Sequence, residues 1–344
     1  MSVRTFKAWL VAGAVVAVVT PVFASAAEQI VVKRTRTMAT AEAQKNFKPA
    51  KNQFGQPDLE GTWTNATLTT LARAAEYGDR LVMTEDEARK VEGSNDAYLA
   101  ERNKASDPSL SVKELPDCGR GFTGVGCGYD NAWTDPGETV MRVRGEPRTS
   151  FLTTANGRVP ARKAGAPAPA ARGAMRPGMS QNDNPETRSP GERCILSFGN
   201  SAGPVMLPLL YNNNYQFVQT KDEVAILVEM VHDVRHIRLN GSHRTDGVRP
   251  YFGDSIGRYE GNTLVVETTN FPRMQAFQGS WENLKVTEKF TRVAPDRMLY
   301  QFTVEDPTIW DTAWGGEYEF GKSDGMVYEY ACHEGNYGLY NILL

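Results

Sequence analysis

The chain has 344 residues, of which 40% are hydrophobic and 23% charged, and its formal net charge is -3 at pH 7. This near-neutral balance argues against nucleic acid or an anionic membrane as the main partner. Once the leader and the polar stretches described below are set aside, about 250 residues remain, which is enough for one large all-β domain.

The N-terminus has the pattern of a secretion signal. Arg4 and Lys7 precede an apolar run over 8–23, which is followed by Ala24-Ser25-Ala26. The export machinery and signal peptidase read a positive region, an apolar core and a small-x-small site. The run is shorter than the roughly 20 apolar residues that span a bilayer. We therefore predict a signal peptide over 1–26 and a periplasmic or secreted protein without a membrane anchor. A flexible polar tether is predicted over 27–55.

The next elements are one helix and a series of short strands. A helix is predicted over 85–105, because Thr84 and Glu87 have the spacing of a capping box. From residue 139 onward, runs rich in Val, Thr, Phe and Tyr are separated by turn pairs such as Asn240-Gly241. The predicted strands are 139–144, 148–153, 215–220, 223–239, 263–269, 286–293, 298–304, 317–320 and 326–331. Such a series is typical of an antiparallel barrel or sandwich.

A long insertion interrupts the strand series. Residues 156–191 contain Pro160, Pro177, Pro185 and an Ala/Pro run over 164–171. This low-complexity composition predicts a disordered surface loop that the fold does not need. We expect residues 56–344 to form a single domain around it.

The four cysteines are Cys118, Cys127, Cys194 and Cys332. In an oxidising compartment their even number predicts two disulfides, for which three pairings are possible. Cys118 and Cys127 flank a Gly-rich loop that can fold back on itself, so we favour that local bridge and a long-range Cys194–Cys332 bridge. A zinc site is the alternative, but no pair has the ligand spacing of a structural zinc site.

Several runs of the chain carry a resemblance to known proteins. They are PDLEGTW (57–63), ERCI (192–195), NNYQ (213–216), EMVHDVR (229–235), the segment 253–271 and YEYACHEGNY (328–337). These runs resemble a family of exported, mostly uncharacterised proteins of soil and aquatic bacteria, and Gly61-Thr62-Trp63 resembles the Gly-x-Trp pattern of lipocalins and other calycins. The resemblance implies a mainly β, antiparallel lipocalin-like barrel with one or a few peripheral helices. It assigns no activity and no catalytic residue.

The strand predicted over 223–239 carries the first group of candidate site residues. On a strand His232 and His236 share one face, while Asp233 and Arg235 point to the other. One of the two faces is expected to line a cavity, and the sequence does not decide which. A joint metal site is disfavoured, because four residues along a strand separate the histidines by about 13 Å.

Two further polar groups lie downstream. His333 and Glu334 directly follow Cys332, so a disulfide there would hold them rigidly, although a plain stapled loop explains them equally well. Asp254 and Ser255 are expected in a turn, for which an Asx-turn is the simpler explanation. The pattern Gly-x-Ser-x-Gly at 253–257 lacks the helix that a hydrolase elbow needs. Phosphate-binding loops are absent from the sequence as well, so no nucleotide cofactor is expected.

Two functions remain open. The first is a cofactor-free acid–base enzyme that acts on a small, partly apolar or aromatic molecule, with His232, Asp233, Asp254, His333 and Glu334 as catalytic candidates. Its predicted substrate-binding residues are Arg235, His236, Trp63, Tyr215 and Trp310. The second is a carrier that binds such a molecule without turnover, in a cavity lined by Trp63, Trp281, Trp310 and Trp314. Neither hypothesis includes a metal.

Overall fold

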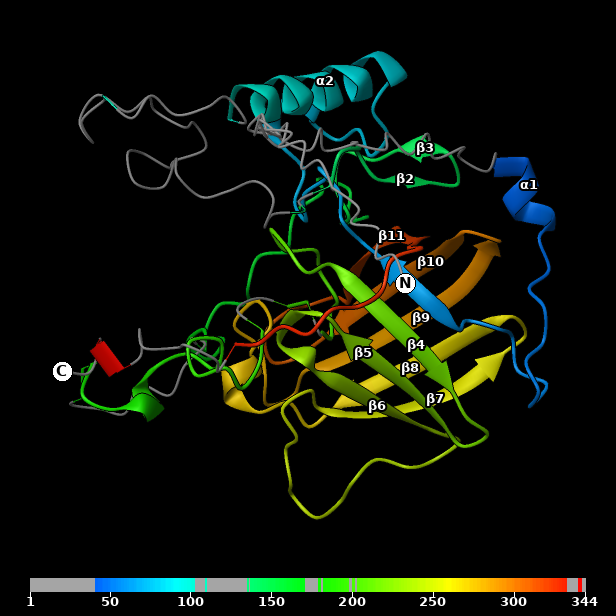
Figure 1. Ribbon diagram of the computed structural model, residues 1–344. Helices are drawn as coiled ribbons and strands as arrows, with labels where there is room; N and C mark the ends of the chain where they lie inside the picture. Colours follow the sequence, from blue (N-terminus) through cyan, green and yellow to red (C-terminus); the bar gives the residue numbers. More distant parts are fainter. Residues whose placement is uncertain are drawn as a thin grey trace, which may run out of the picture. The chain divides into compact units, whose positions relative to one another are not determined.

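The computed structural model describes residues 41–102, 109, 135, 137–170, 179–180, 182–197, 200–201, 203–332 and 340–341. Residues from Ala39 to Leu344 belong to one compact unit (Figure 1). Several predictions therefore lie outside the described residues. These are the signal peptide over 1–26, the Cys118–Cys127 bridge, and the positions of His333 and Glu334.

Nine strands of the described residues close into a β-barrel, which confirms the predicted fold class (Figure 1). They are β1 Gly61–Thr64, β4 Asn214–Gln219, β5 Glu223–Val228, β6 Val234–Leu239, β7 Asp254–Glu260, β8 Thr263–Thr269, β9 Lys285–Ala294, β10 Arg297–Glu305 and β11 Trp314–Lys322. Their order around the barrel is β1-β11-β10-β9-β8-β7-β6-β5-β4, and β4 pairs with β1. The strands follow the sequence order, so tight antiparallel pairs build most of the wall.

One pair of the barrel, β6 and β7, is parallel. Two parallel neighbours cannot be joined by a tight turn, because the chain must return to the starting edge of the sheet. Residues 240–253 make this return as a long loop without a helix (Figure 1). Asn240-Gly241 therefore opens a crossover instead of a hairpin, and the crossover brings loop residues back beside β7.

The predicted strand over 223–239 is wrong as a single element. The 3-10 helix η5, Met230–His232, separates β5 from β6. Val231 and His232 have φ angles of 61° and 45°, which a β-strand cannot accommodate. Beyond the break, Arg235 and Ile237 are buried, whereas Val234, His236 and Arg238 are exposed. The face with Arg235 therefore points into the barrel, and the face with His236 points outward.

Other strand predictions also need correction. Residues 254–260 form β7, so Asp254 and Ser255 begin a strand and do not lie in an Asx-turn. The segment 139–144 contains only β2, Arg142–Val143, which pairs with β3, Glu146–Pro147. The segments 148–153 and 326–331 carry no strand; residues 148 and 152 make only isolated bridges.

The helices form in the segments that precede or connect the barrel strands. The helix α2, Glu85–Arg102, confirms the predicted helix. Its capping box forms as expected, because the backbone N–H of Glu87 donates to Thr84 Oγ1 (3.2 Å) and that of Thr84 donates to Glu87 Oε2 (2.7 Å). Three further 3-10 helices are η1 Ala75–Tyr77, η4 Pro185–Thr187 and η6 Arg273–Gln275. No helix among the described residues has the length and apolar character needed to cross a membrane.

The ordered part begins earlier than the predicted tether allows. The helix α1, Ala41–Asn46, lies within the tether predicted over 27–55. Gln44 is buried there, and its side-chain amide donates to Glu319 Oε2 on β11 (3.2 Å). Lys51 and Pro57 also form a β-bridge. The domain therefore includes residues from about position 41.

The described parts of the predicted insertion contribute no strand, as expected of a loop. They are nevertheless attached to the barrel: the N–H of Lys163 donates to the carbonyl of Ile309 (2.8 Å), and that of Ala170 donates to Gly279 (3.1 Å). The disulfide Cys194–Cys332 then joins the end of this region to the C-terminal segment, across a sequence separation of 138. This is the long-range bridge that the sequence analysis favoured.

The barrel interior is filled by large side chains. The buried set includes Trp63, Tyr215, Phe217, Ile226, Ile237, Leu264, Phe290, Tyr300, Tyr318 and Phe320. Trp63 is fully buried, its indole N–H donates to the carbonyl of Leu59 (3.0 Å), and the Arg292 guanidinium lies 5.5 Å from its ring centre. The tryptophan therefore anchors the first strand by packing, not by lining a ligand cavity.

Candidate functional site

A polar network crosses the barrel interior. Arg235 on β6 donates to both carboxylate oxygens of Glu288 on β9, at 3.1 and 2.6 Å. Tyr300 on β10 donates to the same carboxylate (2.8 Å). A charged pair at this depth is costly unless it is fully hydrogen-bonded. The guanidinium of Arg235 is therefore engaged by Glu288, and the substrate-binding role predicted for Arg235 stays a prediction.

Two more phenols of this network donate to a neighbouring chain segment. Tyr215 donates to the carbonyl of Ser201 (2.9 Å) and Tyr318 to that of Met206 (2.8 Å). Burial raises the pKa of both phenols above its ordinary value, so both remain protonated donors. Tyr215, a predicted substrate-binding residue, thus holds the segment that covers this part of the interior.

Asp233, two residues before Arg235 in the sequence, is a chemically unusual carboxyl. Burial raises its pKa to about 7, and a backbone N–H of Ser197 opposes the shift. Its Oδ2 atom is enclosed and has no hydrogen-bond partner among the described residues. Asp233 has the pKa of a general acid or base, but a reactant cannot reach the enclosed oxygen in this conformation.

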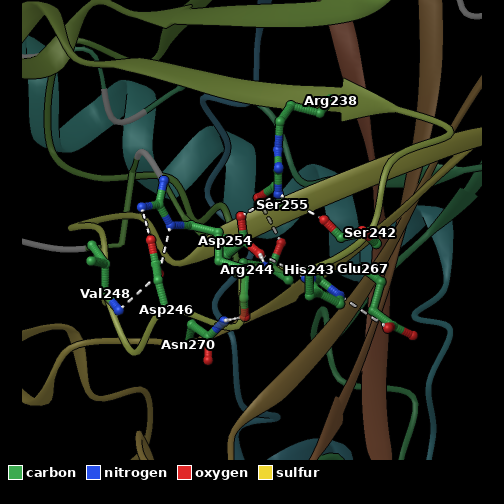
Figure 2. Close-up of polar contacts among 11 residues, drawn as sticks. Arg238, Ser242, His243, Arg244, Asp246, Val248, Asp254, Ser255, Glu267 and Asn270 are labelled. Carbon is green, nitrogen blue, oxygen red and sulfur yellow. Dashed lines mark hydrogen bonds and ion pairs between the residues drawn. The ribbon is translucent and has the colours of Figure 1, made fainter.

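A second polar cluster lies on the outer face of β6, β7 and β8, where the loop 240–253 returns (Figure 2). Its centre is Asp254, whose side chain is buried at 5% exposure. Asp254 accepts hydrogen bonds from Arg238 Nη2 (2.6 Å) and the backbone N–H of Arg244 (2.7 Å), and its Oδ2 lies 3.0 Å from His243 Nδ1. A carboxylate whose two oxygens are each held by a donor is fixed in position, so it also fixes the imidazole that it contacts.

The imidazole of His243 lies between two carboxylates. Its Nδ1 atom faces Asp254, and its Nε2 atom is 3.2 Å from Glu267 Oε1 on β8 (Figure 2). Lys285 on β9 contacts the other oxygen of Glu267 at 3.8 Å. Ser255 points the opposite way, into the barrel, where it bonds Thr268 (2.8 Å). The β7–β8 pairing therefore places the hydroxyl pair Ser255–Thr268 inside the barrel. It leaves Asp254, His243 and Glu267, called here the Asp–His–Glu array, on the outside.

A pocket of about 340 Å³ opens beside this array. Asp254, Arg238 and Arg244 contribute to its lining, together with His236 on β6 and the aromatic residue Tyr251. The side chains of Arg238 and Arg244 are 46% and 40% exposed. The volume is at the small end of known ligand pockets, and the lining combines charged and apolar groups as such pockets do. This pocket brings together three predicted site residues, Asp254, His236 and Arg235, whereas His243 and Glu267 lie behind Asp254 and are not among the lining residues.

The remaining predicted residues lie elsewhere. His232 is exposed on η5, with Nδ1 3.1 Å from the carbonyl of Tyr330. Trp310 and Trp314 pack against each other at 5.3 Å between ring centres and are almost fully buried. Trp281 instead lies against Arg249. The tryptophans thus pack against separate partners among the described residues, and the cavity lining suggested for a carrier stays a prediction.

Sequence reasoning does not find three residues of this cluster. His243 and Arg244 lie in the loop 240–253, which brings them beside β7 only because β6 and β7 pair in parallel. Glu267 lies on β8 and joins the cluster through the register of β7 with β8. Among the described residues, no group of three or more His, Cys, Asp or Glu side chains has an arrangement suited to a metal ion.

Comparisons with known proteins give no relative. No protein-family model, no curated protein and no solved structure matches the chain.

Proposed function

We propose that the protein is an exported, cofactor-independent acid–base enzyme that acts on a small, partly apolar molecule at the β6–β7 pocket. Asp254, which contributes to the pocket lining, is the residue that takes the proton from the substrate and returns it, and His243 behind it carries the proton on to Glu267. The observation that carries the proposal is the Asp254–His243–Glu267 array beside a pocket of about 340 Å³. The signal pattern over 1–26 and the Cys194–Cys332 disulfide support export, because disulfides persist in oxidising compartments.

The array has the parts that proton transfer requires. Asp254 cannot rotate away, since Arg238 and the Arg244 backbone hold both of its oxygens, so the ring of His243 keeps one orientation. The far nitrogen of the ring faces Glu267, whose side chain is 33% exposed. A proton that Asp254 takes from the substrate can therefore pass to Nδ1 of His243, while Nε2 gives its own proton to Glu267 and from there to solvent.

Deuterium exchange tests this proposal without knowledge of the natural substrate. The probes are phenylpyruvate, phenylacetone and cyclohexanone, each with an acidic C–H bond next to a carbonyl, incubated with the mature protein in D₂O. Loss of the C–H signal is followed by proton NMR. We expect the protein to accelerate exchange of at least one probe. His243→Gln should lower that acceleration by about 10²–10⁴-fold, because glutamine has no group that takes up a proton near neutral pH.

His232→Gln is the matched control, since this histidine is exposed on η5 and outside the array. It should retain the wild-type rate. Loss of exchange in His232→Gln with full activity in His243→Gln would move the site to the barrel mouth. Binding of a probe with no acceleration by the wild-type protein would overturn the enzyme and leave a carrier.

A further inference from the structure

We infer that the β6–β7 pocket is built for a monocarboxylate with one aromatic or similarly compact apolar group, an inference that rests on the proposed function by naming the substrate class of its site. The lining divides accordingly. Arg238 and Arg244 contribute the cationic groups of the lining. Val234, Pro250, Tyr251 and Phe252 contribute its apolar surface.

The two arginines have donors to spare. Arg238 uses only Nη2, which donates to Asp254 and to the carbonyl of Ser242. Arg244 uses Nε and Nη2 for Asp246 (Figure 2). The Nε and Nη1 atoms of Arg238 and the Nη1 atom of Arg244 have no protein acceptor among the described residues. Guanidinium groups bind planar carboxylates through such free N–H groups.

The charges around the pocket favour a ligand with a single negative charge. Each guanidinium already has one carboxylate partner, Asp254 for Arg238 and Asp246 for Arg244. The pocket therefore has little excess positive charge, and a dianion such as phosphate would be repelled by the two aspartates. A carboxylate needs only the unused donors and leaves the Asp254–His243 bond intact.

The apolar side limits the size of the ligand. Val234 and Tyr251 are 38% and 45% exposed, which is unusual for large apolar side chains next to a pocket. A volume of about 340 Å³ has room for one ring and a short side chain. The pocket thus matches a ring-bearing acid whose carboxylate lies against the arginines and whose reactive carbon lies toward Asp254.

Phenylacetate and its neutral isostere phenylacetamide test the inference by binding alone. We expect phenylacetate to bind the wild-type protein more tightly than phenylacetamide in NMR titrations, and inorganic phosphate not to compete. Arg244→Gln should weaken phenylacetate binding by about tenfold and leave phenylacetamide unchanged. The backbone N–H of Arg244 still holds Asp254 in this variant, so the array is preserved.

Arg258→Gln is the matched control, because Arg258 also pairs with a carboxylate two residues further on, Glu260, but does not line the pocket. It should bind phenylacetate as the wild type does. Equal binding of the acid and the amide, or an equal effect of the two arginine variants, overturns the inference. Selective binding of phenylacetate without any deuterium exchange of the carbonyl probes would support the inference and overturn the proposed enzyme.

Discussion

Arg235 and Glu288 form a doubly hydrogen-bonded ion pair inside the barrel, with side chains that are 1% and 0% exposed. Tyr300 donates a third hydrogen bond to Glu288. Removing two charges from water costs several kcal/mol, and only complete pairing offsets that cost. The stability of the barrel therefore requires both residues to be present, because either one alone would be an unpaired buried charge.

We expect Glu288→Ala to lower the free energy of unfolding by about 3–5 kcal/mol, because Arg235 would remain charged, buried and unpaired. Urea denaturation measures this change. The double variant Arg235→Met with Glu288→Leu is the control, since it removes both charges and keeps the volume. It should recover most of the loss. A loss below about 1 kcal/mol for Glu288→Ala would mean that water reaches Arg235.

The sequence predicted the barrel because its strands alternate regularly. Seven barrel strands, β4, β5, β6, β8, β9, β10 and β11, overlap the predicted ranges, with β5 and β6 inside the single range 223–239. The turn at Gly261-Asn262 joins β7 to β8 as a hairpin. The break at η5 could not be predicted, because Val231 is a β-branched residue that normally avoids a positive φ. Only the surrounding tertiary packing holds it there, and that packing is not encoded in local propensity.

The site was predicted only in part. Asp254 was chosen because it was expected in a turn, but its role comes from the outward-facing end of β7. His243 was missed because the parallel pairing of β6 with β7 depends on contacts between strands, not on the residues 240–253 alone. Glu288 was missed for a similar reason: it occupies an inner position of β9, where a charged residue is explained only by its partner on β6.

Asp233 should make the stability of the protein depend on pH. Its pKa is about 7 in the folded state, above the ordinary value of 3.8, because the carboxyl is desolvated. Between about pH 4 and pH 7 the folded state keeps a proton on Asp233 that the unfolded state has lost. The stabilisation that comes from this proton is therefore fully present below about pH 4 and is lost as the pH rises through 7. For a fully buried carboxyl the free energy of unfolding would fall by about 1.4 kcal/mol for each pH unit in this range, and the partial exposure of Asp233 reduces that fall.

Asp233→Asn isolates this effect, because asparagine does not titrate. We expect the free energy of unfolding of the wild type, relative to that of Asp233→Asn, to fall by roughly 1–3 kcal/mol between pH 4 and pH 7.5. Asp246→Asn is the control: Arg244 lowers the pKa of Asp246, so removing that carboxyl cannot produce a fall in this range. Parallel pH profiles for the wild type and Asp233→Asn would show that the carboxyl is solvated.

The Cys194–Cys332 bridge should protect both thiols from alkylation and hold the C-terminal segment to the barrel. Intact-mass measurement of the mature protein should show no alkylation before reduction, and peptide mapping should find the two residues cross-linked. Opening a loop of this length should cost up to about 5 kcal/mol of stability. Free Cys194 or Cys332 in the oxidised protein, or equal melting temperatures before and after reduction, would contradict this prediction.

The segment 159–170 should be required for full stability, even though its composition predicts a dispensable loop. Val159 and Ala166 pack against the hydrophobic core, and the backbone of Lys163 bonds Ile309 (2.8 Å). We expect replacement of 159–170 by a Gly/Ser linker of equal length to lower the melting temperature by about 3–8 °C, as the loss of 1–2 kcal/mol does in a large domain. The equal length keeps the loop-closure entropy unchanged, so the shift reports the lost contacts together with the greater backbone freedom of the unfolded Gly/Ser chain. A linker variant that melts within a degree or two of the wild type would show that these contacts contribute nothing and that the loop is dispensable.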